Sequence, residues 1–137
     1  MELSYSLIFL AAVLQFVLGA VWYSPLMFGK WWMQIMEVTN LSKEELNKMQ
    51  KEMIPFYGLQ FLLTFFTTFN LAQFMQYLPQ FSAYHVAFWI WLAFIVPIQI
   101  QCVVWANTKK RFWYKQIFVM ISYQLVSILL AAYILTL

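Results

Sequence analysis

The sequence predicts an all-α integral membrane protein: four transmembrane helices, one interfacial amphipathic helix and one short solvated helix. Of the 137 residues, 64% are hydrophobic and 9% are charged, whereas soluble domains carry about 25% charged residues. Four apolar stretches, at about 4–24, 56–78, 85–106 and 114–136, are each long enough for a bilayer core, which takes roughly 20 residues. We therefore expect a single membrane domain over residues 1–137.

The first stretch runs into the sequence LGAVWYSPLMFGKWW, which covers residues 18–32. Ser24 is a favourable N-cap and Pro25 suits the first position of a helix, so a second helix is expected over about 26–38. Its apolar side chains, Trp31 and Trp32 among them, recur at helical spacing, and polar ones fill the other face. This pattern predicts an amphipathic helix at the membrane surface.

A polar segment follows, and it contains a capping box in which Ser42 caps a helix and Glu45 reaches back to it. We predict a solvated helix over 43–53, which rests on the membrane or the bundle, or docks a partner. Pro55 either begins the next span or kinks one long helix, and the sequence leaves both open.

Polar side chains inside the spans are candidate intramembrane contacts: Gln15, Gln60, Thr64, Gln101 and Gln124. If the spans alternate in direction, Gln15 and Gln124 share one depth, while Gln60 and Gln101 share another. Because an unpaired amide in hydrocarbon is costly, we predict that each matched pair is hydrogen-bonded.

Basic residues indicate the topology, since all eight Lys and Arg lie in or beside the segments 25–55 and 107–113. The positive-inside rule then places both segments in the cytoplasm and both termini outside, in a multi-pass protein of the cell (inner) membrane. The net charge of +3 arises in these segments and does not indicate a nucleic-acid partner.

Residues that carry chemistry are scarce, with no aspartate, one histidine and one cysteine. All five acidic residues lie outside the predicted spans, whereas proton-coupled carriers need an ionisable group inside the membrane. The chain has no catalytic arrangement, phosphate loop or metal-ligand spacing. We expect no enzymatic activity, cofactor or metal.

The quoted LGAVWYSPLMFGKWW sequence resembles the opening signature of a family of small bacterial and archaeal membrane proteins, the domain-of-unknown-function family 1761. The stretch 91–135 is similar to the third and fourth helices of that family. The resemblance implies a fold and a membrane location, and it implies no activity. The residues that define the signature turn here are Trp22, Tyr23, Ser24, Pro25, Gly29 and Lys30.

Two functions remain open at this point. The first is a non-enzymatic self-associating or accessory subunit of a membrane complex, favoured by the small-residue stripe of Ala11, Gln15 and Gly19. The second is a passive channel or carrier for water or a small neutral solute, favoured by the polar stripes and the kink expected at Pro97. The expected partners are the lipid bilayer and either further copies of the chain or a larger complex.

Overall fold

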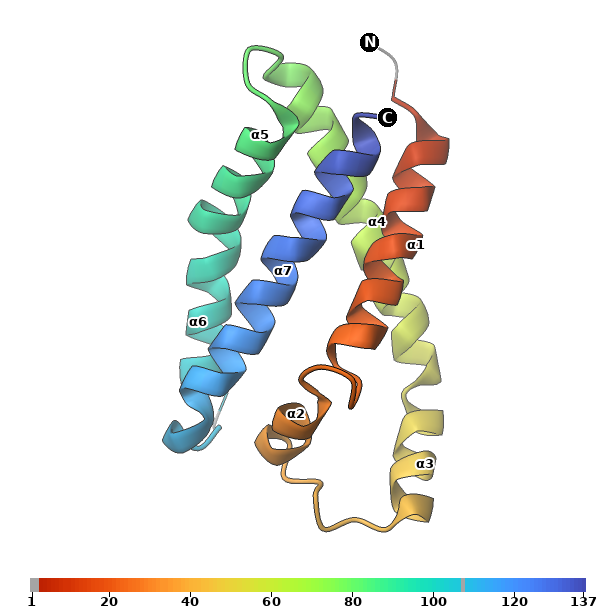
Figure 1. Ribbon diagram of the computed structural model, residues 1–137, viewed down its shortest axis with the longest axis vertical. Coiled ribbons are helices and arrows are strands. Elements are labelled where there is room, and N and C mark those ends of the chain that lie inside the picture. Colours follow the sequence, from red (N-terminus) through yellow and green to blue (C-terminus); the bar gives the residue numbers. More distant parts are fainter. Residues whose placement is uncertain (1–2, 107) are drawn as a thin grey trace.

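The computed structural model describes residues 3–106 and 108–137, which form helices and the turns between them (Figure 1). The predicted domain included residues 1 and 2, and the predicted basic loop included residue 107. These three residues lie outside the described residues. In chain order the elements are α1 Tyr5–Trp22, α2 Gly29–Ile35, α3 Lys43–Glu52, α4 Ile54–Tyr77, α5 Ala83–Ile90, the π-helix η1 Trp91–Ile95, α6 Val96–Trp105, the 3-10 helix η2 Lys110–Phe112 and α7 Trp113–Leu135.

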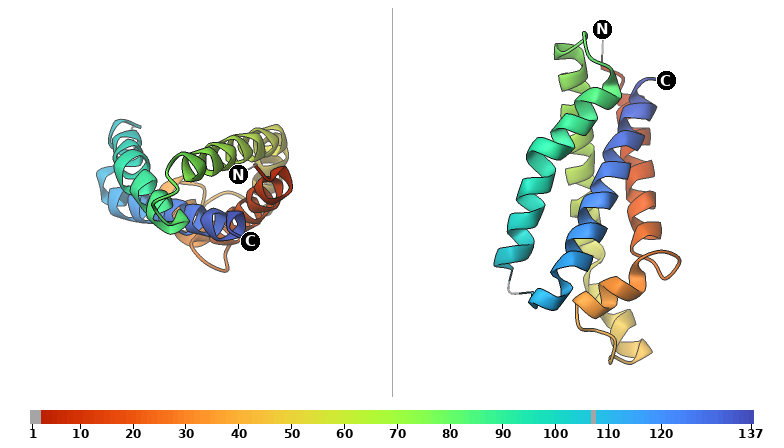
Figure 2. Two further views of the ribbon diagram at one scale, coloured as in Figure 1. Left: turned by 90° about the horizontal axis from the view of Figure 1, so that it is seen from above. Right: turned by 60° about the vertical axis from the view of Figure 1, so that its left-hand side comes forward.

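The long helices form a bundle around α7 (Figures 1 and 2). One side of α7 packs on α1, and the other packs on α5, η1 and α6, while α4 packs mainly on α1. At one end of the bundle lie α2, α3 and the α6–α7 turn, and we call this the basic end. It carries all eight basic residues of the chain: Lys30, Lys43, Lys48, Lys51, Lys109, Lys110, Arg111 and Lys115.

Three helical segments are long and apolar enough to cross a membrane: Tyr5–Trp22, Ala83–Trp105 and Lys110–Leu135. The sequence predicted a fourth such segment over 56–78, and α4 does not qualify. Its length is sufficient at 24 residues, but its three glutamines and Asn70 lower its hydropathy.

Small residues allow the helices of the core to approach closely. Ala11 on α1, Ala87 on α5 and Ala132 on α7 are completely buried and belong to one apolar cluster. Because alanine has only a methyl side chain, the backbones of the three helices come near enough for extensive van der Waals contact.

The two prolines at helix junctions take different forms. Pro55 lies in the first turn of α4, directly after α3 ends, so it begins a new helix. Pro97 lies in the first turn of α6 and follows the π-helical turn η1. At the place where the sequence predicted a kink, the helix therefore has an expanded turn. Since proline has no N–H, the regular bonding pattern is interrupted here, and the wider turn accommodates that interruption.

The capping box is confirmed as the start of α3. The Glu45 backbone N–H donates to Ser42 Oγ at 3.2 Å, and the Ser42 backbone N–H donates to Glu45 Oε2 at 3.2 Å. None of the α3 side chains is buried, in agreement with a solvated helix.

Candidate functional site

The signature residues form a tight turn between α1 and α2. The predicted helix start at Ser24 and Pro25 is wrong, since α2 begins at Gly29 and ends at Ile35. The Ser24 hydroxyl donates to the Val21 carbonyl at 2.6 Å and accepts from the Leu26 N–H at 3.2 Å. Ser24 therefore closes a turn, as serine hydroxyls commonly do, and does not cap a helix.

Gly29 is required by a close approach of the backbone inside this turn. Its N–H donates to the Ser24 carbonyl at 2.8 Å. A Cβ at this position would lie 2.5 Å from the Ser24 carbonyl carbon, which no real side chain tolerates. Pro25 and Lys30 are exposed on the outside of the turn.

The aromatic signature residues attach the turn to α7. Trp22 is buried, and its indole N–H donates to the Val119 carbonyl at 3.2 Å. The Tyr23 ring lies between Trp32 at 4.8 Å and Tyr123 at 5.7 Å, measured between ring centroids. The signature turn thus fixes α1, α2 and α7 relative to one another.

A polar cluster lies inside the bundle where α1, α4 and α7 meet, and we call Gln15, Thr68, Tyr123 and Ser127 the polar node. Gln15 Nε2 donates to Thr68 Oγ1 at 2.7 Å, and Ser127 Oγ donates to Gln15 Oε1 at 2.9 Å. The Tyr123 hydroxyl donates to the Gln15 backbone carbonyl at 3.0 Å. One glutamine therefore joins three helices.

The predicted bond between Gln15 and Gln124 is wrong, because the Gln15 amide bonds to Thr68 and Ser127. Depth alone suggested the glutamine pair. The short side chains of Thr68 and Ser127 lie at the contact itself, and both are buried there.

The second predicted pair, Gln60 with Gln101, is also wrong. Gln60 is exposed on α4, and its amide donates to Thr64 Oγ1 of the same helix at 3.2 Å. Gln101 is exposed on α6, whereas Val103 is 1% exposed. Residues two positions apart in the sequence lie about 200° apart around a helix, so Gln101 points away from the bundle.

A second buried amide belongs to Gln116 on α7, which is 7% exposed. Its Oε1 has no hydrogen-bond partner among the described residues. Gln116 shares the helical stripe of Tyr123 and Ser127, and it is the part of that stripe nearest the basic end. Its free acceptor leaves room for one further donor.

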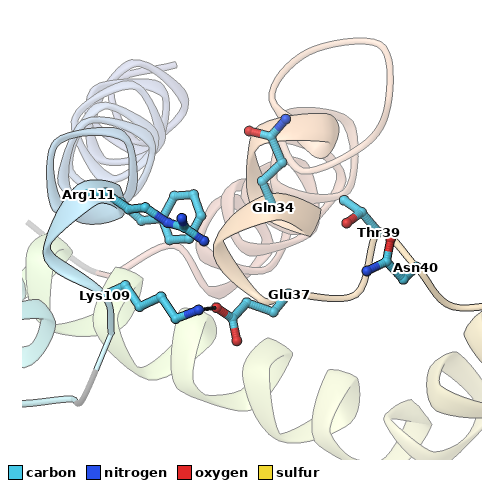
Figure 3. A pocket seen from close by; sticks show the side chains of 7 residues that line it. Gln34, Glu37, Thr39, Asn40, Lys109 and Arg111 are labelled. Carbon is cyan, nitrogen blue, oxygen red and sulfur yellow. Dashed lines mark ion pairs between the residues drawn. The ribbon is translucent and has the colours of Figure 1, made fainter.

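A shallow groove of about 470 Å³ lies at the basic end, between the end of α2 and the α6–α7 turn (Figure 3). Across it, Lys109 Nζ lies 2.7 Å from Glu37 Oε1. This hydrogen bond and the positive charge of Lys109 lower the pKa of the Glu37 carboxyl below its usual value, and Arg111 adds a smaller effect. The groove is lined by Gln34, Glu37, Thr39, Asn40, Lys109, Arg111 and Phe112.

Glu37 has a strained backbone, with φ at 59°. It is the second residue after α2, and the Val38 N–H donates back to the Met33 carbonyl at 3.1 Å, which completes a Schellman motif. Glycine is the usual residue at this left-handed position, and another residue costs about 1 kcal/mol or more there. Sequence reasoning missed this pair because only the fold brings Glu37 and Lys109 together.

The polar node holds only neutral hydrogen-bonding groups, and the groove holds charged ones without a nucleophile beside a base. Among residues 3–106 and 108–137, no three His, Cys, Asp or Glu side chains gather as metal ligands would. The helices and the sites together define a small all-helical protein with apolar segments suited to a membrane.

The chain belongs to the family described as "Protein of unknown function (DUF1761)", which matches residues 6–136. This match confirms the resemblance found in the signature sequence. No curated protein and no solved structure matches the chain.

Proposed function

We propose that the protein is a non-enzymatic, self-associating subunit of a membrane assembly, and that α4 carries its contact face. The observation that supports this is a polar strip on α4, where Gln60 and Thr67 are exposed beside apolar residues such as Leu62 and Phe66. Burial of an amide in hydrocarbon without a strong partner is unfavourable, and interhelical hydrogen bonding relieves that cost. A facing helix from a second copy provides the partners.

The place of α4 beside α1 supports a fourth membrane-spanning segment. Along the two helices, ring centroids of Tyr5 and Phe69 lie 6.2 Å apart, and those of Phe16 and Phe61 lie 6.1 Å apart. If α1 crosses the bilayer, α4 lies at the same depth over most of its length. The strip of Gln60 and Thr67 then contacts protein, while exposed apolar side chains such as Leu62 and Phe66 contact lipid.

Cysteine cross-linking in membranes tests the contact face, in a Cys102→Ser background. We expect disulfide-linked dimers from Gln60→Cys and Thr67→Cys. The matched control is Leu62→Cys, because Leu62 is 64% exposed at similar depth on another face of α4. Monomers at both test positions, or equal dimer yields at position 62, would contradict the proposal.

The orientation that belongs to this proposal has the basic end in the cytoplasm and both termini outside, in the cell (inner) membrane. Asn47→Cys and Gln80→Cys report on the two ends of the bundle, since both side chains are exposed. The labelling position is Gln80 because the neighbouring Ser82 is needed for the fold: its hydroxyl accepts from the His85 N–H and caps α5. An impermeant thiol reagent should label position 80 in intact cells, and labelling of position 47 alone would reverse the orientation.

A passive channel for water or a small neutral solute is the second proposal, and the unpaired Oε1 of Gln116 is the observation that favours it. The polar node gives it less support, because the Gln15 amide already donates to the Ala11 carbonyl and to Thr68 and accepts from Ser127. Liposome swelling with small neutral solutes tests it. A flux that Gln116→Leu abolishes in a folded protein would establish the channel.

A further inference from the structure

The groove at the basic end combines one paired and one unpaired cation. Glu37 bonds to Lys109, and this is the ion pair found in the described part of the chain. The Arg111 guanidinium carbon instead lies 4.7 Å from the centre of the Phe112 ring. This cation–π contact leaves the N–H donors of the guanidinium free for an acceptor.

The opposite wall of the groove offers neutral donors. Figure 3 shows Lys109 and Arg111 reaching in from the α6–α7 turn, with Glu37 between that turn and the segment of Thr39 and Asn40. A hydroxyl and an amide therefore line the same groove of about 470 Å³ as the guanidinium. A planar guanidinium with nearby neutral donors matches the several acceptor oxygens of a phosphate.

The groove lies beside a group of aromatic residues suited to the membrane interface. Lys115 Nζ lies 5.3 Å from the centre of the Trp31 ring, and Trp31 is 38% exposed. The Trp113 indole N–H donates to the Thr108 carbonyl at 2.9 Å, within the turn that carries Lys109 and Arg111. Exposed indole rings favour the level of the lipid headgroups, which is also where lipid phosphates lie.

We propose that the groove between the end of α2 and the α6–α7 turn binds a phosphate-bearing anion, and that in the membrane this is the headgroup of an anionic phospholipid. Arg111 is its principal ligand, with Thr39 and Asn40 as neutral donors. Lys109 also binds the phosphate when the phosphate displaces Glu37 from the ion pair. The strained backbone of Glu37 holds a carboxylate where it competes with the phosphate, and this competition limits how tightly the anion binds.

The experiment measures lipid retention by native mass spectrometry, with the full chain released from nanodiscs of phosphatidylglycerol and phosphatidylcholine. Wild-type protein should retain phosphatidylglycerol preferentially. Arg111→Gln should lower this retention about fivefold, because one basic residue near an anionic surface contributes about that factor. Arg111→Lys should restore it only in part, since lysine lacks the planar donor fork. Glu37→Gln should raise it, because the competing carboxylate is gone.

The matched control is Lys30→Gln, because Lys30 lies at the same end and does not line the groove. Equal losses from Arg111→Gln and Lys30→Gln would overturn the site, since general attraction between charges would then explain retention. Equal retention of the two lipids by the wild-type protein would also overturn the site. Thermal unfolding of each variant verifies folding. If excess inorganic phosphate displaces the lipid, the groove is a site for a soluble anion. If phosphate does not displace the lipid, the groove is a site for the lipid headgroup.

Discussion

Replacement of Gln15 by leucine should remove the side-chain hydrogen bonds that join α1 to α4 and α7, with a side chain of similar size. Gln15 donates to Thr68 Oγ1 at 2.7 Å and accepts from Ser127 Oγ at 2.9 Å, so two interhelical bonds are lost. Such bonds contribute on average about 0.6 kcal/mol each and at most about 1.7 kcal/mol.

The partners left behind moderate the loss. The Thr68 hydroxyl already donates to the Thr64 carbonyl of its own helix at 2.7 Å, and it keeps that bond in the variant. The Ser127 hydroxyl can turn to a carbonyl one turn earlier in α7, as serines in helices commonly do. We therefore expect Gln15→Leu to lower the free energy of unfolding by about 1–2 kcal/mol.

The assay is equilibrium unfolding in mild detergent for Gln15→Leu, Thr68→Val and the double variant. A coupling energy of about 0.6 kcal/mol or more is expected, because the two side chains contact each other. Gln101→Leu is the control, since Gln101 is exposed, and it should leave stability nearly unchanged. Additive losses, or a Gln15→Leu protein as stable as wild type, would refute the role assigned to the polar node.

Two further predictions concern close contacts and pH. Gly19→Ala should cost about 1–3 kcal/mol in the same unfolding assay, because its Cβ would lie 2.9 Å from the Tyr123 hydroxyl oxygen. Gly58→Ala, with nothing within 4 Å, should be neutral or slightly stabilising. The lowered pKa of Glu37 makes its pair with Lys109 stabilising above the usual value of 4.5, and that stabilisation is lost as the pH falls. The melting temperature of Glu37→Gln should therefore depend less on acidic pH than that of wild type.

Local sequence patterns predicted the helices well where the physical cause is local. The capping box of Ser42 and Glu45 determines where α3 begins, because both of its bonds lie within four residues. The long apolar stretches likewise predicted α1 and α7 closely. Ser24 was misleading because serine closes a turn and caps a helix through similar bonds, and only the Gly29 contact distinguishes them.

Contacts between helices could not be predicted in the same way. Depth matching placed Gln15 and Gln124 together, yet depth does not determine which faces of two helices meet. Thr68 was available as a partner because α4 packs on α1, and nothing in either stretch specifies that neighbour. The contact of Glu37 with Lys109 depends on the whole fold, so no local pattern indicates it.

The signature turn connects the interior of the bundle to the groove. Trp22 bonds to the Val119 carbonyl and fixes the end of α1 against α7. Gly29 allows the chain to reverse against Ser24, and this reversal sets the direction in which α2 leaves. Since α2 is only 7 residues long, its C-terminal end stays near α7, and Glu37 reaches Lys109. A larger side chain at position 29 should therefore disturb the groove as well as the turn.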